Sequence, residues 1–275
     1  MPAFDYELVG KIGSMALIRK EDSDIDYNIF ARLGRELRPG MIWVSSGAAE
    51  IGRIDYIHRH GRELSGDAQE VKADYAAQGQ AILMGEYRRY IPHGYSVRQL
   101  LVEHTHFNDE EKRAYIRGLL LRCAAQGAIP IVNYNDPVSV DEIRKLELAK
   151  YRASIDHVVE CVDNDETAAV ICDLVHARYL VILTSVDGIY RDPNDPDTLV
   201  EAVEGKDASE VLAAMEELQK SCVGASRAGA NGARAKLDFI RGPVMNGTTV
   251  IIARADKRLS DVIAGRCRRT VFRIR

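Results

Sequence analysis

The sequence predicts an α/β protein built around a buried sheet, and two observations lead to this prediction. Short apolar runs rich in β-branched residues alternate with longer segments of helical periodicity, and the runs occupy residues 41–44, 128–132, 179–183 and 248–253. Three of these runs end in polar turns, and open α/β sheets bind ligands outside the carboxyl ends of their strands. A chain of 275 residues with 46% hydrophobic content can bury a core of this kind.

Composition excludes several classes of function. The net charge of -4 gives no general attraction to nucleic acid or to an anionic membrane surface. No apolar run reaches the length of a membrane span, and the acidic N-terminal residues do not resemble a signal peptide. The five cysteines are scattered and odd in number, which favours reduced thiols. We therefore expect a cytoplasmic protein with no membrane or nucleic-acid partner.

The first strand is expected within residues 6–18, with a break at Gly13. It contains Lys11, and a lysine in an apolar strand is either an edge residue in water or a cation placed near a ligand. Taken alone, the pattern favours the edge position. A helix over 26–37 follows, and the strand after it runs directly into residues 45–49 (SSGAA). Small residues between a strand and a helix let backbone N–H groups approach an anion, although such turns are common.

The middle of the chain continues the alternation. Residues 69–90 are strongly helical, 97–103 form a strand, and 109–126 form a helix that ends at Gly127. Four histidines in this region lack acidic or cysteine partners at metal-ligand spacing and are expected to face solvent: His58, His60, His104 and His106. Polar residues 133–137 follow the strand at 128–132. The charged, mostly helical segment 141–160 fits an insertion or a contact surface.

The segment 161–190 combines two features of a phosphate-handling site. An acid–amide–acid cluster, Asp163 to Asp165, opens a helix over 166–177, and the strand at 179–183 ends in the polar turn 184–188. Beyond it we expect the following elements: a helix at 208–217, a glycine-rich loop at 224–236 and a helix at 233–240. The basic tail, 254–275, favours a solvated rim over a nucleic-acid-binding arm.

An ordered series of motifs resembles the amino acid kinase family, and within it the glutamate 5-kinases most closely. In chain order these motifs are KIGS at 11–14, VSSGA at 44–48, KADYAAQGQ at 72–80, NYND at 133–136, DND at 163–165, LTSVDGIY at 183–190 and NGARAK at 231–236. The resemblance covers about residues 8–272, essentially a whole kinase domain. The RNA-binding-like C-terminal (PUA) domain of many glutamate 5-kinases is expected to be absent.

The resemblance implies a three-layer α/β/α sandwich with a mostly parallel central sheet. It implies one kinase domain over 1–275, with an acceptor-binding lobe at about 1–165 and an ATP-binding lobe at about 166–275. The implied reaction transfers the γ-phosphoryl group of MgATP to the carboxylate of a small acid, giving an acyl phosphate, as in proline biosynthesis. ATP and Mg²⁺ are the implied cofactors, with Mg²⁺ carried by ATP rather than by a protein metal site. We also expect a homo-oligomer.

The same resemblance assigns roles to residues. Lys11 and Lys236 would clamp the charge on the moving phosphoryl group, worth about 3–4 kcal/mol, and Asp165 would orient both lysines. No base is needed, because a carboxylate nucleophile carries no proton. The residues assigned to the acceptor are Ser46, Gly47, Asp136 and Asn164. The residues assigned to ATP are Lys11, Gly13, Ser14, Thr184, Ser185, Ala230, Asn231, Gly232, Ala233, Arg234, Ala235 and Lys236.

Departures from the family pattern bear mainly on the acceptor. The substituted positions are Tyr134, Val162, Ser185, Asn231, Ala233 and Ala235. Between Asp136 and Asn164 the chain is about a dozen or more residues longer than the pattern, which is typical of a functional loop. Within this stretch, residues 144–159 are either a surface helix that adds a subunit contact, the favoured interpretation, or a lid. Such a lid would close over an acceptor that is longer or more negative than glutamate.

Three functions remain open. The first is a kinase acting on glutamate or a related acid. The second is a kinase of the same fold acting on another small anion, such as a phosphonate, a phosphate ester or a carbamate. The third is a non-catalytic nucleotide-binding sensor or storage protein. Retention of Lys11, Asp165 and Lys236 favours catalysis, because a binder need not keep an orienting carboxylate between two cations.

Overall fold

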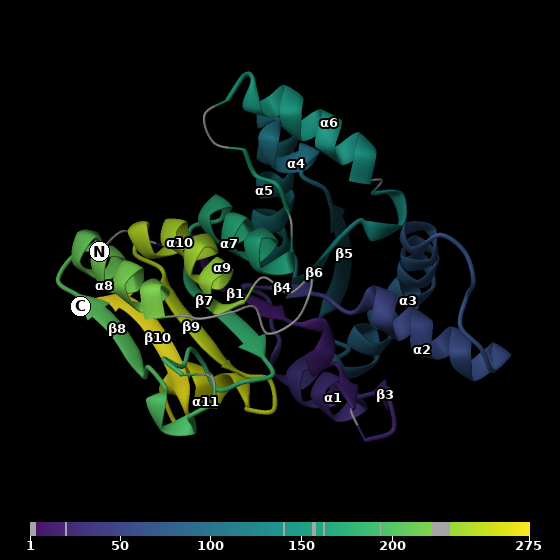
Figure 1. Ribbon diagram of the computed structural model, residues 1–275, viewed down its shortest axis with the longest axis horizontal. Helices are drawn as coiled ribbons and strands as arrows, with labels where there is room; N and C mark the ends of the chain where they lie inside the picture. Colours follow the sequence, from purple (N-terminus) through teal and green to yellow (C-terminus); the bar gives the residue numbers. More distant parts are fainter. Residues whose placement is uncertain are drawn as a thin grey trace. The chain divides into compact units, whose positions relative to one another are not determined.

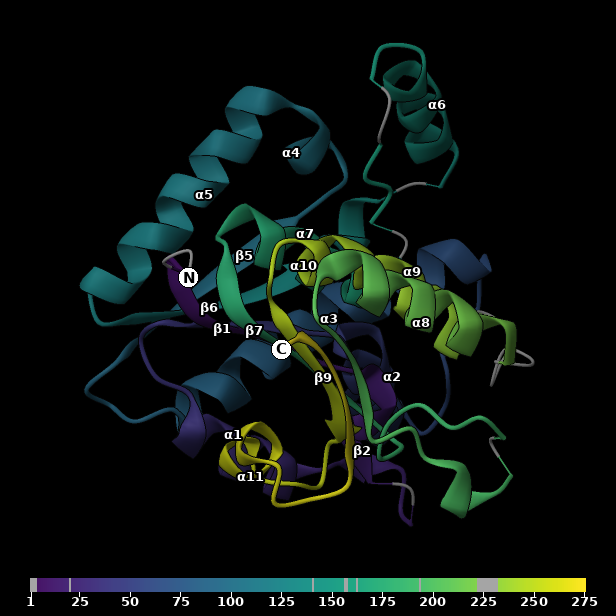
Figure 2. The same ribbon diagram turned by 90° about the vertical axis from the view of Figure 1, so that its left-hand side faces the viewer.

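The computed structural model describes residues 4–19, 21–139, 141–155, 158–161, 163–192, 194–221 and 232–275. The chain divides into two compact units: unit 1, Met1–Ile12 with Asp165–Arg275, and unit 2, Gly13–Asn164. Each unit contains a sheet with helices on both of its faces (Figures 1 and 2), which confirms the predicted α/β class. The acceptor-binding and ATP-binding lobes expected from the sequence are defined by their ligands, so they remain a prediction.

The sheet of unit 1 is mostly parallel. Its strand order is β1 (Tyr6–Ile12), β7 (Ala177–Thr184), β9 (Thr249–Arg254), β10 (Arg269–Ile274) and β8 (Ala202–Gly205). The first three strands run parallel, β10 runs antiparallel to β9, and β8 runs parallel to β10. The helical elements of this unit are α7 (Asn164–Leu174), η3 (Pro196–Thr198), α8 (Ala208–Ser221), α9 (Ala233–Phe239), α10 (Arg241–Met245) and α11 (Leu259–Ala264).

The basic tail was expected to be a solvated rim, and most of its arginine and lysine side chains are exposed, but the tail also contributes a strand that the sequence did not predict. Strand β10 enters the sheet because it buries Val271 and Phe272, which are 5% and 0% exposed. Its arginines find a partner on the neighbouring strand β8: Arg273 lies 2.6 Å from the carboxylate of Glu204, and Arg275 pairs with the same group. A count of charges alone does not reveal this pairing.

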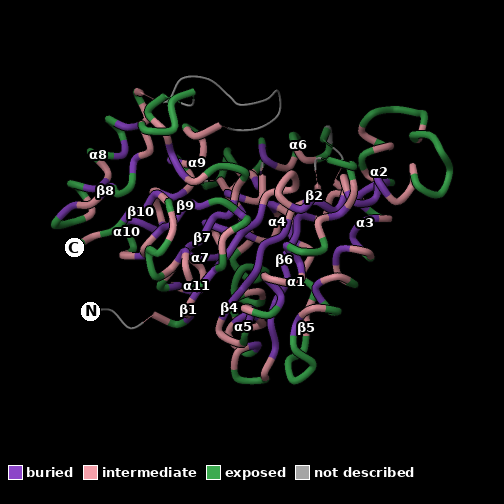
Figure 3. The backbone as a smooth tube through the Cα atoms, turned by 90° about the horizontal axis from the view of Figure 1, so that it is seen from below, coloured by how far each residue is buried: buried purple, intermediate pink, exposed green. Residues whose placement is uncertain are grey.

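The sheet of unit 2 is parallel, in the order β5 (Ser96–Val102), β6 (Ala128–Tyr134) and β4 (Met41–Ser45), and a short antiparallel pair, β2 (Ile18–Arg19) and β3 (Asp24–Ile25), lies apart from it. The helical elements are η1 (Ser14–Ala16), α1 (Tyr27–Glu36), α2 (Ala48–His60), α3 (Ala68–Tyr90), α4 (Thr105–Asn108), α5 (Glu110–Ala125), η2 (Asp136–Val138) and α6 (Asp141–Arg152). Strands β4 and β6 are buried along their whole length (Figure 3), as their continuous apolar runs predict.

Local signals set the helix ends in unit 2. Helices α1, α3 and α5 each begin after an aspartate whose side chain accepts backbone N–H groups of the first turn: Asp26, Asp67 and Asp109. Helix α2 ends at Gly61, which adopts the left-handed conformation that glycine tolerates best. Although most residues after Ile51 are polar, α2 continues to His60, because one of its faces buries Ile51 and Ile54.

Helices α2 and α3 touch through their backbones. A Cβ atom on Gly79 would lie 1.8 Å from the carbonyl oxygen of Ala48, and one on Gly52 would lie 1.8 Å from that of Tyr75. Only glycine permits this approach. The contact fixes the position of α3, whose residues Lys72 and Gln80 contribute to the site described below.

One side chain of α6 contacts the residue that precedes α4, and this contact corrects one expectation about the histidines. His58 and His60 are exposed as expected. His104 is 2% exposed, and its Nε2 atom lies 3.0 Å from the carboxylate of Glu147 on α6. Burial lowers the pKa of His104. The partner of this histidine comes from a later segment of the chain, so local spacing does not predict it.

No helix in the described ranges is long and apolar enough to cross a lipid bilayer. The four cysteines among these residues are free thiols, and three of them are buried: Cys123, Cys161 and Cys172.

Candidate active site

In unit 1 the carboxyl ends of β1 and β7 lie side by side. The two strands pair in parallel, with Lys11 opposite Ile182 and Ile12 opposite Leu183. Thr184 ends β7, and its carbonyl oxygen accepts a hydrogen bond from Ala255 N at 2.8 Å. The parallel register therefore brings Lys11 to the sheet edge at which the polar turn after β7 begins.

Two lysines hold one buried carboxylate in unit 1. The Lys11 Nζ atom lies 2.6 Å from Asp165 Oδ1, and Lys236 Nζ donates to Asp165 Oδ2. The Asp165 side chain is 1% exposed, and those of Lys11 and Lys236 are 10% and 21% exposed. The edge position predicted for Lys11 from the local pattern is wrong, because the lysine is buried beside an ionic partner. We call these three residues the lysine clamp.

The clamp is a cationic centre with a fixed negative group. Burial opposes ionisation of Asp165, but the charges and hydrogen bonds of the two lysines outweigh it and hold the pKa of this carboxyl below its usual range. Asp165 also lies in the first turn of α7, where the helix dipole favours a negative charge. Two ammonium groups and one carboxylate leave a net positive charge, which suits an incoming anion.

The described part of the glycine-rich loop leads into α9. Gly232 precedes this helix, which carries Ala233, Arg234, Ala235 and Lys236. The carbonyl of Arg234 accepts a hydrogen bond from Gln219 of α8, which attaches the helix start to unit 1. Of the other residues assigned to ATP, Ser185 is exposed beyond β7. Ala230 and Asn231 lie outside the described residues.

In unit 2 a chain of amides and a hydroxyl connects four segments: the turn after β4, α3, β6 and the first residue of α7. Asn164 Nδ2 donates to Ser46 Oγ at 2.9 Å and to Asn133 Oδ1 at 3.0 Å. Asn133 Nδ2 donates in turn to Gln80 Oε1 at 2.9 Å. Asn133 and Gln80 are 2% and 7% exposed, so each amide is held in one orientation by its neighbour. We call these four residues the amide network.

One acceptor of this network is unused. Asn164 Oδ1 is buried and has no hydrogen-bond partner among the described residues. A buried polar atom without a partner costs about 1–3 kcal/mol, and a ligand donor placed there would remove that cost. An ammonium group is the donor that such an oxygen accepts best.

The charged members of the unit 2 site lie at its exposed side. Lys72 Nζ donates to Asp136 Oδ1 at 3.1 Å, and the side chains are 65% and 26% exposed. Asp136 opens η2, directly after the strand that carries Asn133. An exposed pair of this kind contributes at most about 1 kcal/mol to stability, so a ligand can displace it at small cost.

Gly47 joins β4 to α2 in a conformation that requires glycine. Its φ angle is +105°, and an added Cβ atom would lie 3.0 Å from Leu17 Cδ1 and 3.7 Å from Ser14 Cα. Ser14 therefore lies next to the turn that follows Ser46, within unit 2. Gly13, the residue before η1, has an ordinary extended backbone, with φ -75° and ψ 151°.

The described geometry thus forms two groups from the predicted residues: the lysine clamp in unit 1, and Ser46 with Asn164 in unit 2. Three members of the unit 2 site were not assigned a role from the sequence: Lys72, Gln80 and Asn133. All three lie within quoted motifs, at the first and last positions of KADYAAQGQ and the first of NYND. Gln80 could have been found from the sequence, because it is a polar residue directly after the small residue Gly79 in a motif shared with the resembled family.

The chain belongs to the amino acid kinase family, whose sequence pattern matches residues 8–254. Among named proteins it is similar to a glutamate 5-kinase of Dehalococcoides mccartyi, with 34% identity over 260 residues that cover 93% of this chain and 62% of that protein. A glutamate 5-kinase of Alkaliphilus metalliredigens is 29% identical over 97% of this chain and 95% of its own length.

Solved structures support the fold. A carbamate kinase from Giardia lamblia bound to AMP-PNP superposes with a TM-score of 0.57, covering 99% of this chain and 100% of that one at 16% identity. At this identity the likeness concerns the fold alone. The chain spans about three fifths of the length of the first two glutamate 5-kinases it matches.

Proposed function

We propose that this protein transfers the γ-phosphoryl group of ATP to a carboxylate oxygen of a small acid, as a glutamate 5-kinase does, and releases ADP and an acyl phosphate. The observation that supports this most directly is the lysine clamp, Lys11–Asp165–Lys236. Phosphoryl transfer asks a protein mainly for positioning and for cations near the moving charge. The clamp supplies two such cations and holds them in place before any ligand binds.

The proposed reaction forms one bond and breaks one. The acceptor carboxylate oxygen attacks the γ-phosphorus, the bond from phosphorus to the bridging oxygen breaks, and ADP leaves with the electron pair. Lys11 and Lys236 stabilise the charge on the transferred group, and Asp165 keeps both ammonium groups in position. The depressed pKa of Asp165 keeps this carboxylate ionised at neutral pH. No proton has to move, because the nucleophile is already an anion.

We further propose that Mg²⁺ enters with the nucleotide. Within the described ranges, no three His, Cys, Asp or Glu side chains are grouped so that they would hold a metal ion. The carboxylate best placed near the phosphates, Asp165, is already engaged by two lysines. Metal-bound phosphate oxygens would lower the negative charge that the lysines have to offset.

The acceptor is proposed to be an amino acid that lies against the amide network of unit 2. Asn164 Oδ1 would accept from its ammonium group, and Ser46 and Asp136 would bind its other polar groups. Glutamate is the acceptor suggested by the named relatives, which would place the reaction in proline biosynthesis. Gln80 and Asn133 act as positioning residues, because they hold the Asn164 amide in one orientation.

The alternative acceptor class is a longer or more highly charged anion. The observation that favours it is α6, which lies in the stretch between Asp136 and Asn164 that is longer than the family pattern and carries Arg144, Lys145 and Arg152. We also propose that the protein works in the cytoplasm, as its reduced thiols suggest. Assembly into a homo-oligomer remains an expectation.

The proposed reaction is tested by trapping its product. The purified protein is incubated with MgATP, hydroxylamine and one acid at a time, beginning with glutamate, and hydroxamate and ADP are measured. Hydroxamate formation that equals ADP release is expected, because only an acyl phosphate yields a hydroxamate. The control is the Asp165→Asn variant, which should lose both signals together. ADP release with no hydroxamate for any acid would contradict phosphorylation of a carboxylate.

A further inference from the structure

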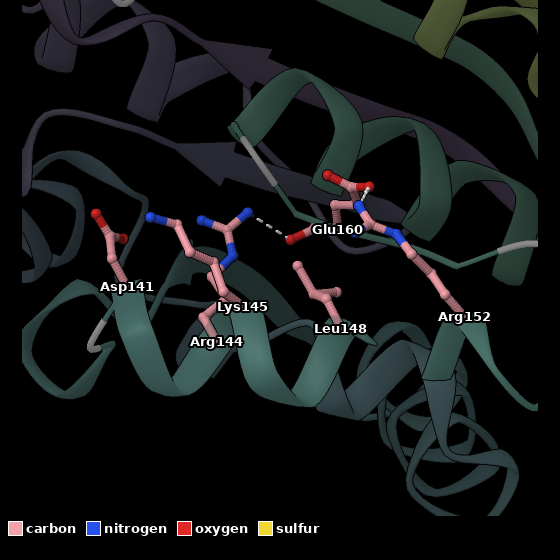
Figure 4. A pocket seen from close by; sticks show the side chains of 6 residues that line it. All are labelled: Asp141, Arg144, Lys145, Leu148, Arg152 and Glu160. Atoms are coloured by element: carbon pink, nitrogen blue, oxygen red, sulfur yellow. Dashed lines mark hydrogen bonds and ion pairs between the residues drawn. The ribbon is translucent and has the colours of Figure 1, made fainter. Parts of the chain in front are cut away.

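A cavity of about 320 Å³ lies between α6 and the chain that returns from it, entirely within unit 2 (Figure 4). Its lining residues are Asp141, Arg144, Lys145, Leu148, Arg152 and Glu160. Arg144, Lys145 and Arg152 are cations on one helix and reach towards the same space. A volume of this size is at the lower end of the range for small-molecule sites.

The cavity is already ordered around Arg144. Its Nη2 atom donates to the carbonyl oxygen of Glu160 at 2.7 Å, and its guanidinium carbon lies 5.8 Å from the centre of the Tyr134 ring. On the same helix, Leu148 is 5% exposed and Glu147 reaches His104. Helix α6 is therefore packed against unit 2 by an apolar, an ionic and a cation–π contact, and the guanidinium is held without a carboxylate partner.

The charges in the cavity do not cancel. Arg152 pairs with Glu160, which neutralises one cation. No carboxylate in the described part of the chain forms an ion pair with Arg144 or Lys145, in contrast to Arg152. The Nε atom of Arg144 is in addition buried and has no acceptor among the described residues. Two cations and an unused donor face one exposed carboxylate, Asp141, so the cavity favours an anionic group.

The cavity adjoins the proposed acceptor site along the chain. Tyr134, which the Arg144 guanidinium covers, directly follows Asn133 of the amide network and precedes Asp136 by two residues. Its hydroxyl lies 3.1 Å from Ser139 Oγ, which holds the loop between β6 and α6 against the strand end. The segment that follows β6 thus contains Asp136, a proposed acceptor-binding residue, and leads to α6, which carries the cations of the cavity.

We propose that this cavity binds a second anionic group, a phosphate or a carboxylate, at the far end of the acceptor. The acceptor is then longer and more negative than glutamate. This inference rests on the proposed function, since it names the substrate class of the same site. Arg144 and Lys145 bind the remote anion, and the amide network binds the amino-acid end.

The test compares glutamate with dipeptides that extend it by one residue carrying further anionic groups. Glutamate, α-glutamyl-glutamate and α-glutamyl-O-phosphoserine are assayed by coupled ADP release. For the wild-type protein, kcat/KM for at least one dipeptide is expected to exceed that for glutamate about 10- to 100-fold, the usual contribution of a charge-assisted hydrogen bond. In Lys145→Met this ratio should fall about 10-fold. The matched control is Lys150→Met, an exposed lysine of the same helix outside the cavity, which should keep the wild-type ratio.

Two further measurements separate the possible failures. Inorganic phosphate should inhibit competitively against the preferred acceptor; inhibition that is non-competitive would assign the cavity to a separate effector anion and overturn the proposal. If the ratio of dipeptide to glutamate kcat/KM is the same in Lys145→Met and Lys150→Met, the inference is also overturned. In that case, turnover of glutamate by both variants would leave the proposed function intact. If no acid is phosphorylated, the proposed function fails, and calorimetric titration of the same dipeptides into both variants still decides the inference. Dipeptide binding that Lys145→Met does not weaken would refute it.

Discussion

The polar groups of the two units differ in kind. The lysine clamp of unit 1 is ionic, with two ammonium groups around a carboxylate that is 1% exposed. The amide network of unit 2 is neutral, and the charged pair of the same unit, Lys72 and Asp136, is more exposed than the network's Asn133 and Gln80. A buried carboxylate can hold two cations in position to stabilise the charge of a transferred phosphoryl group. Neutral amides instead select a ligand by the geometry of their hydrogen bonds. In the proposed function, reaction chemistry therefore belongs to the ionic clamp and acceptor choice to the neutral amide network.

The largest effect is expected when the clamp is opened. Lys236→Met should lower kcat about 10²- to 10³-fold, as the loss of one group that stabilises transition-state charge does, with little change in acceptor KM. Steady-state kinetics beside a thermal melt measure both effects. The control is Lys220→Met, which removes a 74%-exposed lysine of unit 1 and should keep the wild-type rate. A folded Lys236→Met variant with wild-type kcat would remove the clamp from the reaction.

Changes in the amide network should affect KM for the acid rather than kcat. Ser46→Ala removes an acceptor from Asn164 and should raise KM for the acid about 10-fold or more, with KM for ATP within about twofold of wild type. Asp136→Asn should act in the same direction. Initial rates with each substrate varied in turn provide the measurement, and Ser65→Ala, at an exposed position of the same unit, is the control. Equal rises in both KM values would show that these residues do not distinguish acceptor from nucleotide.

The contact between α2 and α3 allows the amide network to be disturbed without removing any of its polar groups, because Gly79 precedes Gln80. Gly79→Ala places a methyl group where the Ala48 carbonyl lies and should destabilise the protein by about 1–3 kcal/mol, while shifting Gln80 and raising acceptor KM. Gly85→Ala on the same helix meets no atom within 4 Å and should instead stabilise by up to about 1 kcal/mol. Urea unfolding of the two variants measures the difference. Similar stabilities would mean that the helices can separate freely.

The smallest effect concerns a carboxyl of unit 1 outside the clamp. Burial raises the pKa of Asp173 to about 6, and its side chain accepts from Asn246 at 2.9 Å. A raised pKa means that the folded state keeps its proton between about pH 4 and 6, where the unfolded chain has lost it. Stability therefore falls as pH rises through this window and then stays level.

Asp173→Asn removes that dependence. The variant should match the wild type near pH 4 and exceed it by about 1–2 kcal/mol at pH 7, because the amide carries no buried charge. Unfolding free energies across pH 4 to 8 check this, with the exposed Asp256→Asn as the control. A stability difference that does not change with pH would assign the effect to packing rather than to ionisation.

The sequence predicts which residues form the lysine clamp better than it predicts their surroundings. Lys11, Asp165 and Lys236 follow from ordered motifs, yet the local pattern placed Lys11 at an edge, because its partner lies far along the chain. His104 was misplaced for the same reason, since its partner Glu147 belongs to a later element, α6. The ion pairs of Arg273 and Arg275 likewise depend on Glu204 of another strand. Local periodicity predicts which residues form an element, whereas pairing across the fold decides what each side chain meets.

The backbone contact of α2 with α3 also has a consequence for engineering. Gly52 and Gly79 leave no side chain there to vary, so the framework that carries Gln80 and Lys72 offers no room for redesign. Helix α6 is the opposite case, with Ile143 and Leu146 55% and 66% exposed and an attachment that depends on few side chains. A library that aims to change acceptor preference should therefore randomise α6 and its cavity and leave the two glycines untouched.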